Sequence, residues 1–288
     1  MSPASTEQFL LEQYTGHPAS QLQDLRKALY QSVFGCGHLI TDTSAAAEGI
    51  RREAAEAGPC SREIEALDGP WSRVHLGVLA DGLTPETLAC IFARSAAMPH
   101  GDADTLQEKL AVLRRLIHSG ALPYSPAEAD AELDDWRKNG FPACHHSDEY
   151  RAAYRPAYRV LHRTYVHLLP LLAAIDRALA ENPRVLLAIE GGAASGKSTL
   201  ADLLTAIYPD TALFHADDFF LRPEQRTAAR YAQPGGNLDR ERLESEILIP
   251  ISRNKAAVYR PFNCRTLSLR EPVTILPGRL NIVEGSYS

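Results

Sequence analysis

The chain has 288 residues, which is enough for two domains of roughly 100–200 residues each. Its composition, 45% hydrophobic and 23% charged, is that of a globular protein, and 30 basic against 36 acidic residues give a net charge of −6. Because phosphate backbones require a basic face, this charge argues against nucleic acid as a main partner, although a local basic pocket for a nucleotide stays possible.

Cysteine usage and the lack of long apolar segments indicate a cytoplasmic protein. The five cysteines are widely spaced and form no CxxC pair, which is typical of reduced thiols rather than of a disulfide framework or a zinc cluster. The first 16 residues show no basic stretch followed by an apolar run, so we expect no signal peptide. The most apolar stretch, 166–180, contains Pro170, Asp176 and Arg177 and is too short and too charged to span a bilayer. We therefore expect no membrane partner.

Residues 1–183 are predicted to form a mostly α-helical N-terminal domain. Three stretches carry apolar residues at helical spacing: 20–33, 84–97 and 104–118. Thr84 before Pro85 is typical of an N-cap followed by proline at the first helical position. A further long helix is predicted from Pro156 to Glu181, with a kink at Pro170.

From residue 184 onward the pattern changes to alternating strands and helices, which predicts an α/β domain with a parallel sheet flanked by helices. Arg184–Glu190 is a short apolar run of the kind that is buried in such a sheet. Helices are expected from Lys197 to about Tyr208 and over 238–251. Further strands are expected at 212–215, 257–262, 272–276 and 280–283. We place the domain boundary near residue 183, which gives domains 1–183 and 184–288.

The strongest motif is GGAASGKST at Gly191–Thr199, which matches G-x-x-x-x-G-K-[ST] between a predicted strand and a predicted helix. Glycines let backbone N–H groups approach phosphate oxygens, and the helix N-terminus adds the positive end of its dipole. Lys197 can then reach the β- and γ-phosphates of ATP, and the Ser198 hydroxyl can ligate Mg²⁺. A chance glycine-rich turn before a helix is the alternative.

We therefore predict ATP and Mg²⁺ as cofactors of a P-loop NTPase domain. The residues expected to bind ATP are Gly191, Gly192, Ala193, Ala194, Ser195, Gly196, Lys197, Ser198 and Thr199.

Two adjacent carboxylates, Asp217 and Asp218, follow the predicted strand 212–215. Ligands of open α/β sheets bind outside the carboxyl ends of the strands, so both side chains are expected at the ligand crevice. One carboxylate can accept the proton of an attacking hydroxyl, while its neighbour holds Mg²⁺ through water. Alternatively, the pair only caps a following turn. Their position directly after a P-loop unit favours the functional interpretation.

These residues belong to a set of segments that resembles the uridine kinase family of P-loop nucleoside kinases and related bacterial uridine kinase-like proteins. The segments are EGGAASGKST, HADDFF, PGGNLD, VYRPFNC and NIVEGSYS, in this order within residues 184–288. The resemblance implies that Asp217 is the base toward the acceptor 5′-hydroxyl. It further implies that Asp239 binds the ribose hydroxyls, that Tyr259 is a substrate-binding residue, and that Glu284 lies near Mg²⁺ and the attacking group.

Two departures from the family pattern accompany the resemblance. Residues 260–264 read RPFNC, where nucleoside kinases carry an acidic residue and then a base-contacting histidine, and Cys264 falls near that histidine position. Family members also continue past the acidic strand with an arginine-bearing lid, so we expect this chain to be a fragment that lacks the lid. The arginines that are candidates to replace the lid arginine are Arg222, Arg226, Arg230, Arg260 and Arg265.

The N-terminal half contains three polar clusters, at residues 31–38, 73–76 and 145–159. Histidines there could belong to a metal or phosphate-ligand site together with Asp148 or Glu149, although no pair has zinc-motif spacing. The histidines concerned are His38, His75, His145 and His146. Structural or surface histidines are the alternative. The Tyr/Arg repeat at 150–159 fits stacking on a helix surface or a domain interface better than nucleic-acid binding.

The sequence as a whole predicts a Mg·ATP-dependent kinase that transfers the γ-phosphoryl group to a hydroxyl of a uridine-like nucleoside or a similar small metabolite. Lys197 and Asp217 are the expected catalytic residues, and Ser198, Asp218 and Glu284 the expected metal ligands. The alternative is an ATP-binding regulatory or partner-binding module without phosphoryl transfer, because the helical N-terminal domain has no assigned chemistry. The oligomeric state and the acceptor stay open.

Overall fold

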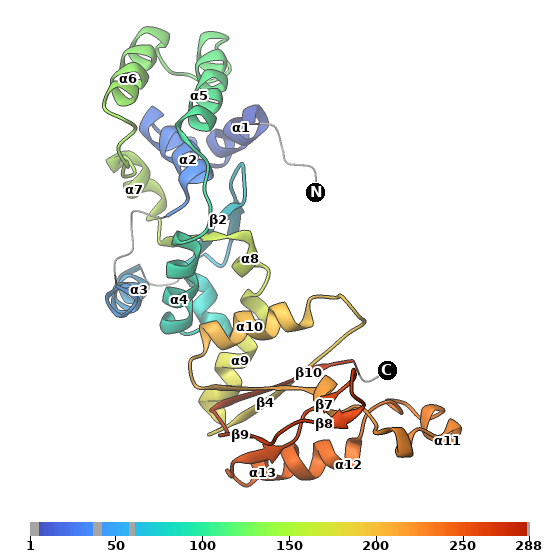
Figure 1. The fold of residues 1–288 in the computed structure, drawn as a ribbon. Coiled ribbons are helices and arrows are strands. Elements are labelled where there is room, and N and C mark those ends of the chain that lie inside the picture. Colours follow the sequence, from blue (N-terminus) through green and yellow to red (C-terminus); the bar gives the residue numbers. More distant parts are fainter. Residues whose placement is uncertain (1–5, 37–41, 58–60, 287–288) are drawn as a thin grey trace. The chain divides into compact units, whose positions relative to one another are not determined.

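The structure is a computed structural model that describes residues 6–36, 42–57 and 61–286. It contains two compact units, residues 1–174 and 175–288, which we describe separately (Figure 1). The division falls inside helix α9 (Leu169–Glu181), whereas the sequence places the boundary near residue 183. The second part of this helix belongs to the C-terminal unit. There, Tyr208 donates a hydrogen bond to Asp176 (2.9 Å), and Arg279 donates one to the carbonyl of Leu179 (2.6 Å).

The N-terminal unit is mainly helical, as the apolar periodicity predicts. Its helices are α1 (Thr6–Gly16), α2 (Leu22–Phe34), α3 (Thr43–Ala57), α4 (Pro85–Ala96), α5 (Ala103–His118), α6 (Pro126–Lys138), α7 (Asp148–Tyr154) and α8 (Arg163–Val166), with the 3₁₀ helix η1 (Leu76–Asp81). Three of them confirm the predicted stretches at 20–33, 84–97 and 104–118. Thr84 caps α4 by accepting a hydrogen bond from the backbone N–H of Thr87.

The N-terminal unit also contains a small antiparallel sheet that the sequence analysis did not predict. Strand β2 (Trp71–His75) lies between β1 (Ile64–Ala66) and β3 (Tyr158–His162). The predicted helix from Pro156 to Glu181 is therefore wrong over its first part, because residues 158–162 pair along their whole length with β2. The hydrogen bonds of this ladder and the burial of the adjacent Val160 and Leu161 outweigh the local helical pattern.

The C-terminal unit is built on a parallel sheet with strand order β4–β10–β5, as an α/β domain requires. Strand β4 (Val185–Glu190) leads into the motif loop, which comprises residues 191–196. Helix α10 (Lys197–Ile207) follows the loop, and β5 (Thr211–His215) follows α10. Strand β10 (Leu280–Gly285) enters between these two and pairs with both of them. All six residues of β10 are buried, because it is the central strand of the three.

The segment between β5 and β10 contains short elements. These are η2 (Ala216–Phe219), η3 (Pro223–Gln225), α11 (Ala228–Tyr231), α12 (Arg240–Leu243), the π-helical turn η4 (Glu244–Leu248), α13 (Ile249–Ser252), β6 (Ala257–Tyr259), β7 (Phe262–Asn263), β8 (Ser268–Leu269) and β9 (Val273–Ile275). The consecutive elements α12, η4 and α13 confirm the helix predicted over 238–251. The strands expected at 257–262 and 272–276 form, but β6 and β9 pair with each other in an antiparallel ribbon rather than in the parallel sheet.

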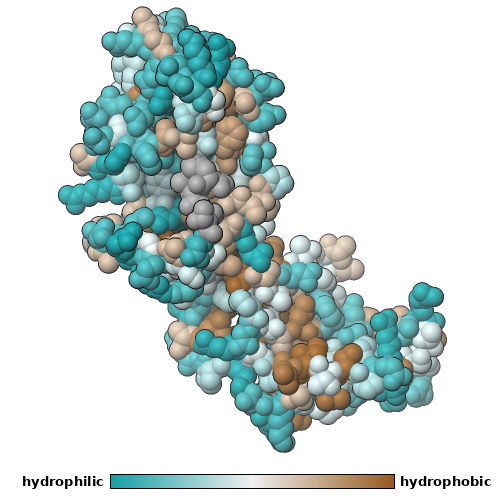
Figure 2. All heavy atoms as spheres, turned by 60° about the vertical axis from the view of Figure 1, so that its left-hand side comes forward, coloured by the Kyte–Doolittle hydropathy of each residue, from teal (hydrophilic) through white to brown (hydrophobic). Residues whose placement is uncertain are grey.

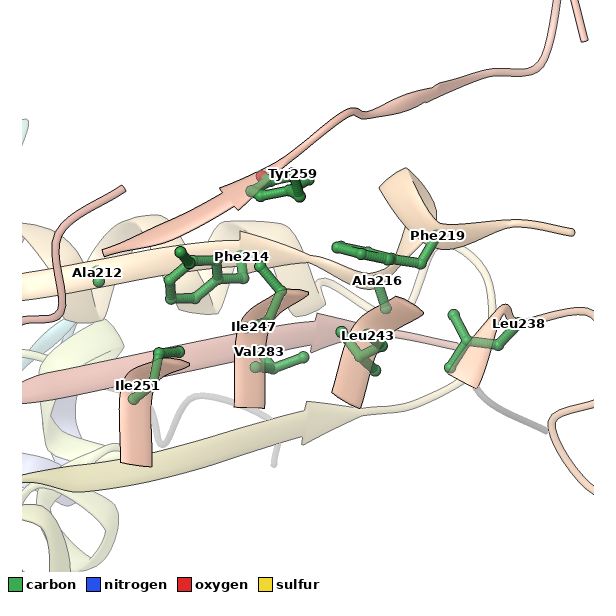
Figure 3. Packing of buried hydrophobic residues seen from close by; sticks show 11 residues of the cluster. Ala212, Phe214, Ala216, Phe219, Leu238, Leu243, Ile247, Ile251, Tyr259 and Val283 are labelled. Atoms are coloured by element: carbon green, nitrogen blue, oxygen red, sulfur yellow. The ribbon is translucent and has the colours of Figure 1, made fainter. Parts of the chain in front are cut away.

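One hydrophobic cluster holds this unit together (Figure 3). Phe214 of β5 and Val283 of β10 pack with Ile247 of the helical segment, and Tyr259 of β6 lies over Phe219 with ring centroids 5.1 Å apart. Burial of large aromatic and branched side chains supplies the main stabilisation here. The cluster fixes the short turn that follows β5, and with it the two aspartates that precede Phe219.

Hydrophobic side chains at the surface are concentrated on the C-terminal unit. Figure 2 shows a hydrophobic patch in the lower part of the view, where this unit lies. The large hydrophobic side chains of the C-terminal unit with more than a third of their surface exposed are Leu186, Tyr231, Ile249, Val258, Leu267 and Leu276. Among the residues the structure describes, no helix combines the length and the apolar character needed to cross a bilayer.

Candidate phosphate-binding site

The motif loop has the strand–loop–helix geometry of a phosphate-binding loop. It follows β4 directly, and α10 begins at Lys197. Gly196 has φ +89°, a left-handed conformation that favours glycine, and Ala194 has φ +58°. A Cβ at Gly191 would approach the Ser195 hydroxyl to 2.9 Å, whereas Gly192 and Gly196 face open space. Such an open loop at a helix N-terminus leaves room for an anion to approach the backbone.

Lys197 and Ser198 lie at the first turn of α10. The Lys197 ammonium donates a hydrogen bond to the carbonyl of Gly192 (2.9 Å), so the side chain folds back across the motif loop. The Ser198 hydroxyl donates to Glu284 (3.3 Å). Lys197 and Ser198, which are expected to bind phosphate and Mg²⁺, therefore lie on the same helical turn, and Ser198 contacts Glu284 of β10.

Glu284 connects three segments that are distant in the sequence. It lies near the carboxyl end of β10, 5% exposed, and its second carboxylate oxygen accepts a hydrogen bond from Nδ1 of His215 (2.6 Å). His215 ends β5, directly before the pair Asp217-Asp218. Because β10 lies between β4 and β5, their parallel carboxyl ends meet at one edge of the sheet. No role is predicted for this histidine from the HADDFF segment, although its position at the end of a strand is a signal for one.

The two aspartates have different surroundings. The Asp217 side chain is exposed and forms no hydrogen bond with another described residue, which leaves its carboxylate free to meet a ligand. Asp218 is half-buried and accepts a hydrogen bond from the hydroxyl of Tyr259 (3.2 Å). Burial raises the pKa of Asp218 above its usual value, although the hydrogen bond from Tyr259 lowers it. The structure therefore brings Asp218 and Tyr259 together. It holds the Asp218 carboxylate in place, while the Asp217 carboxylate stays accessible to a ligand.

Asp239 has a structural role in this conformation. It is 1% exposed, one oxygen caps α12 by accepting from the backbone N–H of Arg242 (3.3 Å), and the other accepts from the side chain of Gln225 (2.9 Å). Its own backbone N–H donates to the carbonyl of Phe219 (2.7 Å). The segments HADDFF and PGGNLD are thereby held side by side, while the binding of acceptor hydroxyls by Asp239 stays a prediction.

Several of the candidate lid-replacing arginines are engaged within residues 221–270. Arg230 forms a two-bond ion pair with Glu241 (2.7 and 2.8 Å). Arg226 donates to the carbonyl of Leu221, and Arg260 donates to that of Arg270. These contacts order the segments that carry the arginines, and the supply of a catalytic arginine from this set stays a prediction.

The histidine clusters of the N-terminal unit do not form a metal site in the part of the chain that the structure describes. No group of three or more His, Cys, Asp or Glu side chains lies close enough there to hold an ion. His38 lies outside the described residues. His146 instead makes hydrogen bonds to Asp24 and Tyr158.

The donor set at the sheet edge fits the chemistry of Mg²⁺ and a polyphosphate. A hydroxyl (Ser198) and a carboxylate (Glu284) meet at 3.3 Å, and oxygen ligands of this kind are those that Mg²⁺ prefers, with water completing its coordination. The open loop and the Lys197 ammonium provide the positive counterpart for phosphate oxygens. Asp217 and Asp218 follow the adjacent strand.

A solved structure resembles this chain: the structure of a possible uridine kinase from Bacillus stearothermophilus. The two share 20% sequence identity with a TM-score of 0.33, and the match covers 40% of this chain and 71% of that one. No protein-family model matches the chain, and the search of curated proteins finds no relative. A structural likeness this weak carries no argument about the site, whose chemistry follows from its own residues.

Proposed function

We propose that the C-terminal unit binds Mg·ATP and transfers the γ-phosphoryl group to a hydroxyl of a uridine-like nucleoside or a similar small metabolite. The observation that carries this proposal is the meeting, at the carboxyl ends of three adjacent parallel strands, of the motif loop, Glu284 and the Asp217-Asp218 pair. Phosphoryl transfer needs little beyond positioning and charge stabilisation, and these groups provide both.

Each residue has a defined task in this proposal. The loop N–H groups and Lys197 hold the triphosphate, and Ser198, Glu284 and Asp218 hold Mg²⁺, which when bound offsets charge on the phosphoryl oxygens. His215 donates its Nδ1 hydrogen to Glu284 and thereby fixes the orientation of that carboxylate. Asp217, exposed beside this group, accepts the acceptor hydroxyl proton as the acceptor oxygen bonds to the γ-phosphorus. The bond from the γ-phosphorus to the bridging oxygen breaks, and ADP and a phosphate ester leave.

A second candidate function is an ATP-binding module that does not transfer phosphate. Asp239 favours it, since both oxygens of this buried carboxylate are used in protein hydrogen bonds rather than being presented to an acceptor. In that case the P-loop would hold ATP and the N-terminal unit would respond to it.

A screen with the full chain distinguishes these functions. Incubation with Mg·ATP and a panel of nucleosides and sugars, read by mass spectrometry, should give an ATP-dependent phosphorylated product, which the second function excludes. Tight ATP binding without product across the panel would favour that second function.

The Lys197→Ala variant tests the nucleotide site itself. It should bind ATP at least about tenfold more weakly, because it loses the charged contact to the β- and γ-phosphates. Affinity equal to that of the parent, measured by calorimetry, would show that this loop is not the ATP site.

A further inference from the structure

Two of the three polar clusters of the N-terminal unit, at residues 31–38 and 145–159, contribute to the wall of one open cavity of about 950 Å³. Its walls come from α2, α3, α4, the residues 145–146 and the stretch 151–160, so parts of the chain more than 100 residues apart contribute to it. Cavities of roughly 300–1,000 Å³ are the size that small-molecule sites have in proteins. All residues that line the cavity belong to the N-terminal unit.

One side of the cavity is a fixed hydrogen-bond chain. The hydroxyl of Tyr158 lies 2.6 Å from Nε2 of His146, and Nδ1 of His146 lies 2.7 Å from Asp24. Asp24 also accepts hydrogen bonds from the backbone and the hydroxyl of Ser147. Burial lowers the pKa of His146 to about 4, so the ring is neutral at pH 7 and carries one hydrogen, which it donates to Asp24. Nε2 therefore accepts from Tyr158, and the orientation of the tyrosine is set.

A buried guanidinium lies against the same tyrosine. Arg73 is 1% exposed and its Cζ is 5.1 Å from the centroid of the Tyr158 ring. It donates to Gln31 (2.8 Å), which in turn donates to the Tyr158 hydroxyl (3.3 Å), and it pairs with Glu65 (3.2 Å). Among the described residues its Nη2 has no hydrogen-bond partner.

The charged side chains lining the cavity are mostly cationic. Four of them are basic, namely Lys27, Arg151, Arg155 and Arg159, and two are acidic, namely Glu53 and Glu56. Arg159 donates two hydrogen bonds to the Glu53 carboxylate (2.8 and 2.9 Å) and so forms an ion pair with it. Within the described residues, Lys27 and Arg155 form no ion pair with a carboxylate.

Lys27 and Arg155 are the two cationic side chains of the wall that are available to an anion. The Lys27 ammonium donates to the carbonyl of Cys144 (2.8 Å), and burial lowers its pKa, so an adjacent negative charge would favour its charged form. Arg155 has φ +45°, a left-handed conformation that is uncommon for a non-glycine residue and is concentrated at functional sites. The apolar part of the wall, which includes the partly exposed Ala46, Ala57 and Pro156, offers a surface for the body of a ligand.

We propose that this cavity binds a small organic anion, with a phosphate or carboxylate head against Lys27 and Arg155 and an apolar or aromatic body against Pro156 and Tyr158. A guanidinium and an ammonium both suit either head group, and the bonded Tyr158 hydroxyl gives the site a fixed polar edge. The N-terminal unit is then a metabolite-binding domain attached to the nucleotide-binding unit.

Titration calorimetry tests the proposal on the full chain carrying Lys197→Ala, which removes the main phosphate contact of the motif loop. The probes are inorganic phosphate and citrate, and at least one should bind with a Kd on the order of 1 mM or tighter. Binding of phosphate alone assigns a phosphate head, and binding of citrate alone assigns a carboxylate head.

Three further substitutions in the same chain locate the bound anion. Arg155→Ala and Lys27→Met should each weaken binding at least about tenfold, because each removes a charged contact. Lys138→Ala, a change at an exposed position of α6 that does not line the cavity, should leave the affinity within about twofold of the parent. Circular dichroism of each variant checks that it is folded.

Two results would overturn the proposal: no binding of either anion, or binding that Arg155→Ala and Lys27→Met leave unchanged. Neither result bears on ATP binding by the C-terminal unit, which the separate comparison of the parent with Lys197→Ala measures.

Discussion

The motif loop and the network around His146 are built in opposite ways. The motif, residues 191–199, is one consecutive stretch that is mostly exposed, and its polar side chains make few contacts. The network joins Asp24, Gln31, Arg73, His146 and Tyr158, is largely buried, and has most of its hydrogen bonds within the protein. A contiguous exposed loop is available for a ligand at little cost in stability. A dispersed buried network contributes to the stability of the unit, because each member leaves another unpaired when it is lost.

The largest effect is expected at the exposed site and on activity alone. Asp217→Asn should lower the rate of phosphoryl transfer by about 10²–10⁴-fold, because the amide cannot accept the acceptor proton, while ATP affinity and urea unfolding stay as in the parent. Asp210→Asn, a change at an exposed position of the same unit, serves as control. Equal transfer rates for parent and Asp217→Asn would remove the base assignment.

At the buried network we expect the reverse, namely a loss of stability without a change in ATP binding. Arg73→Met should lower the free energy of unfolding of the N-terminal unit by about 3–5 kcal/mol, because the mostly buried Glu65 carboxylate would lose its cationic partner and keep only the hydrogen bond from Gln13. ATP affinity should not change. The matched substitution Arg62→Met removes an exposed pair with Asp81 and should cost less than about 1 kcal/mol. A cost at position 73 as small as that at position 62 would show that the network does not stabilise the unit.

The protonation of His146 gives a pH dependence to the same unit. Its pKa of about 4 in the folded chain lies below its unfolded value of 6.5, with Asp24, Arg73 and Lys27 as charged neighbours. Between these two values the unfolded chain binds the extra proton, so stability is full above pH 6.5 and falls as the pH decreases toward 4. From pH 7 to pH 5 the parent should lose about 2 kcal/mol more than His146→Gln in urea unfolding. Parallel pH profiles of the two proteins would contradict this.

The smallest effect is expected where the exposed site borders the core. Burial raises the pKa of Asp218, and the hydrogen bond from Tyr259 lowers it in part. Tyr259→Phe removes this hydrogen bond, so the pKa of Asp218 should rise further. The acid limb of the pH–rate profile for transfer should therefore move upward by up to about one pH unit, equivalent to about 1.4 kcal/mol. Tyr231→Phe, at an exposed tyrosine, should leave the limb in place. An unmoved limb in Tyr259→Phe would exclude Asp218 as a titrating group in the reaction.

Much of the C-terminal unit follows from local sequence. The apolar run of β4, the glycines of the loop and the periodicity of α10 predicted the strand–loop–helix unit, because each signal acts over a few neighbouring residues. The pairing of β6 with β9 outside the parallel sheet was not predicted, since a short apolar strand carries no record of its partner.

The sequence by itself determined the strand–loop–helix unit at the glycine-rich motif, the α/β character of the C-terminal unit and the helices α2, α4 and α5, since these depend on contacts within a few residues along the chain. Only the tertiary structure decided that residues 158–162 form a strand, that His215 and Ser198 share Glu284, and that the polar clusters at 31–38 and 145–159 line one cavity. Each of these depends on segments brought together over long sequence separations, where the ladder bonds and burial of the folded state outweigh local preference.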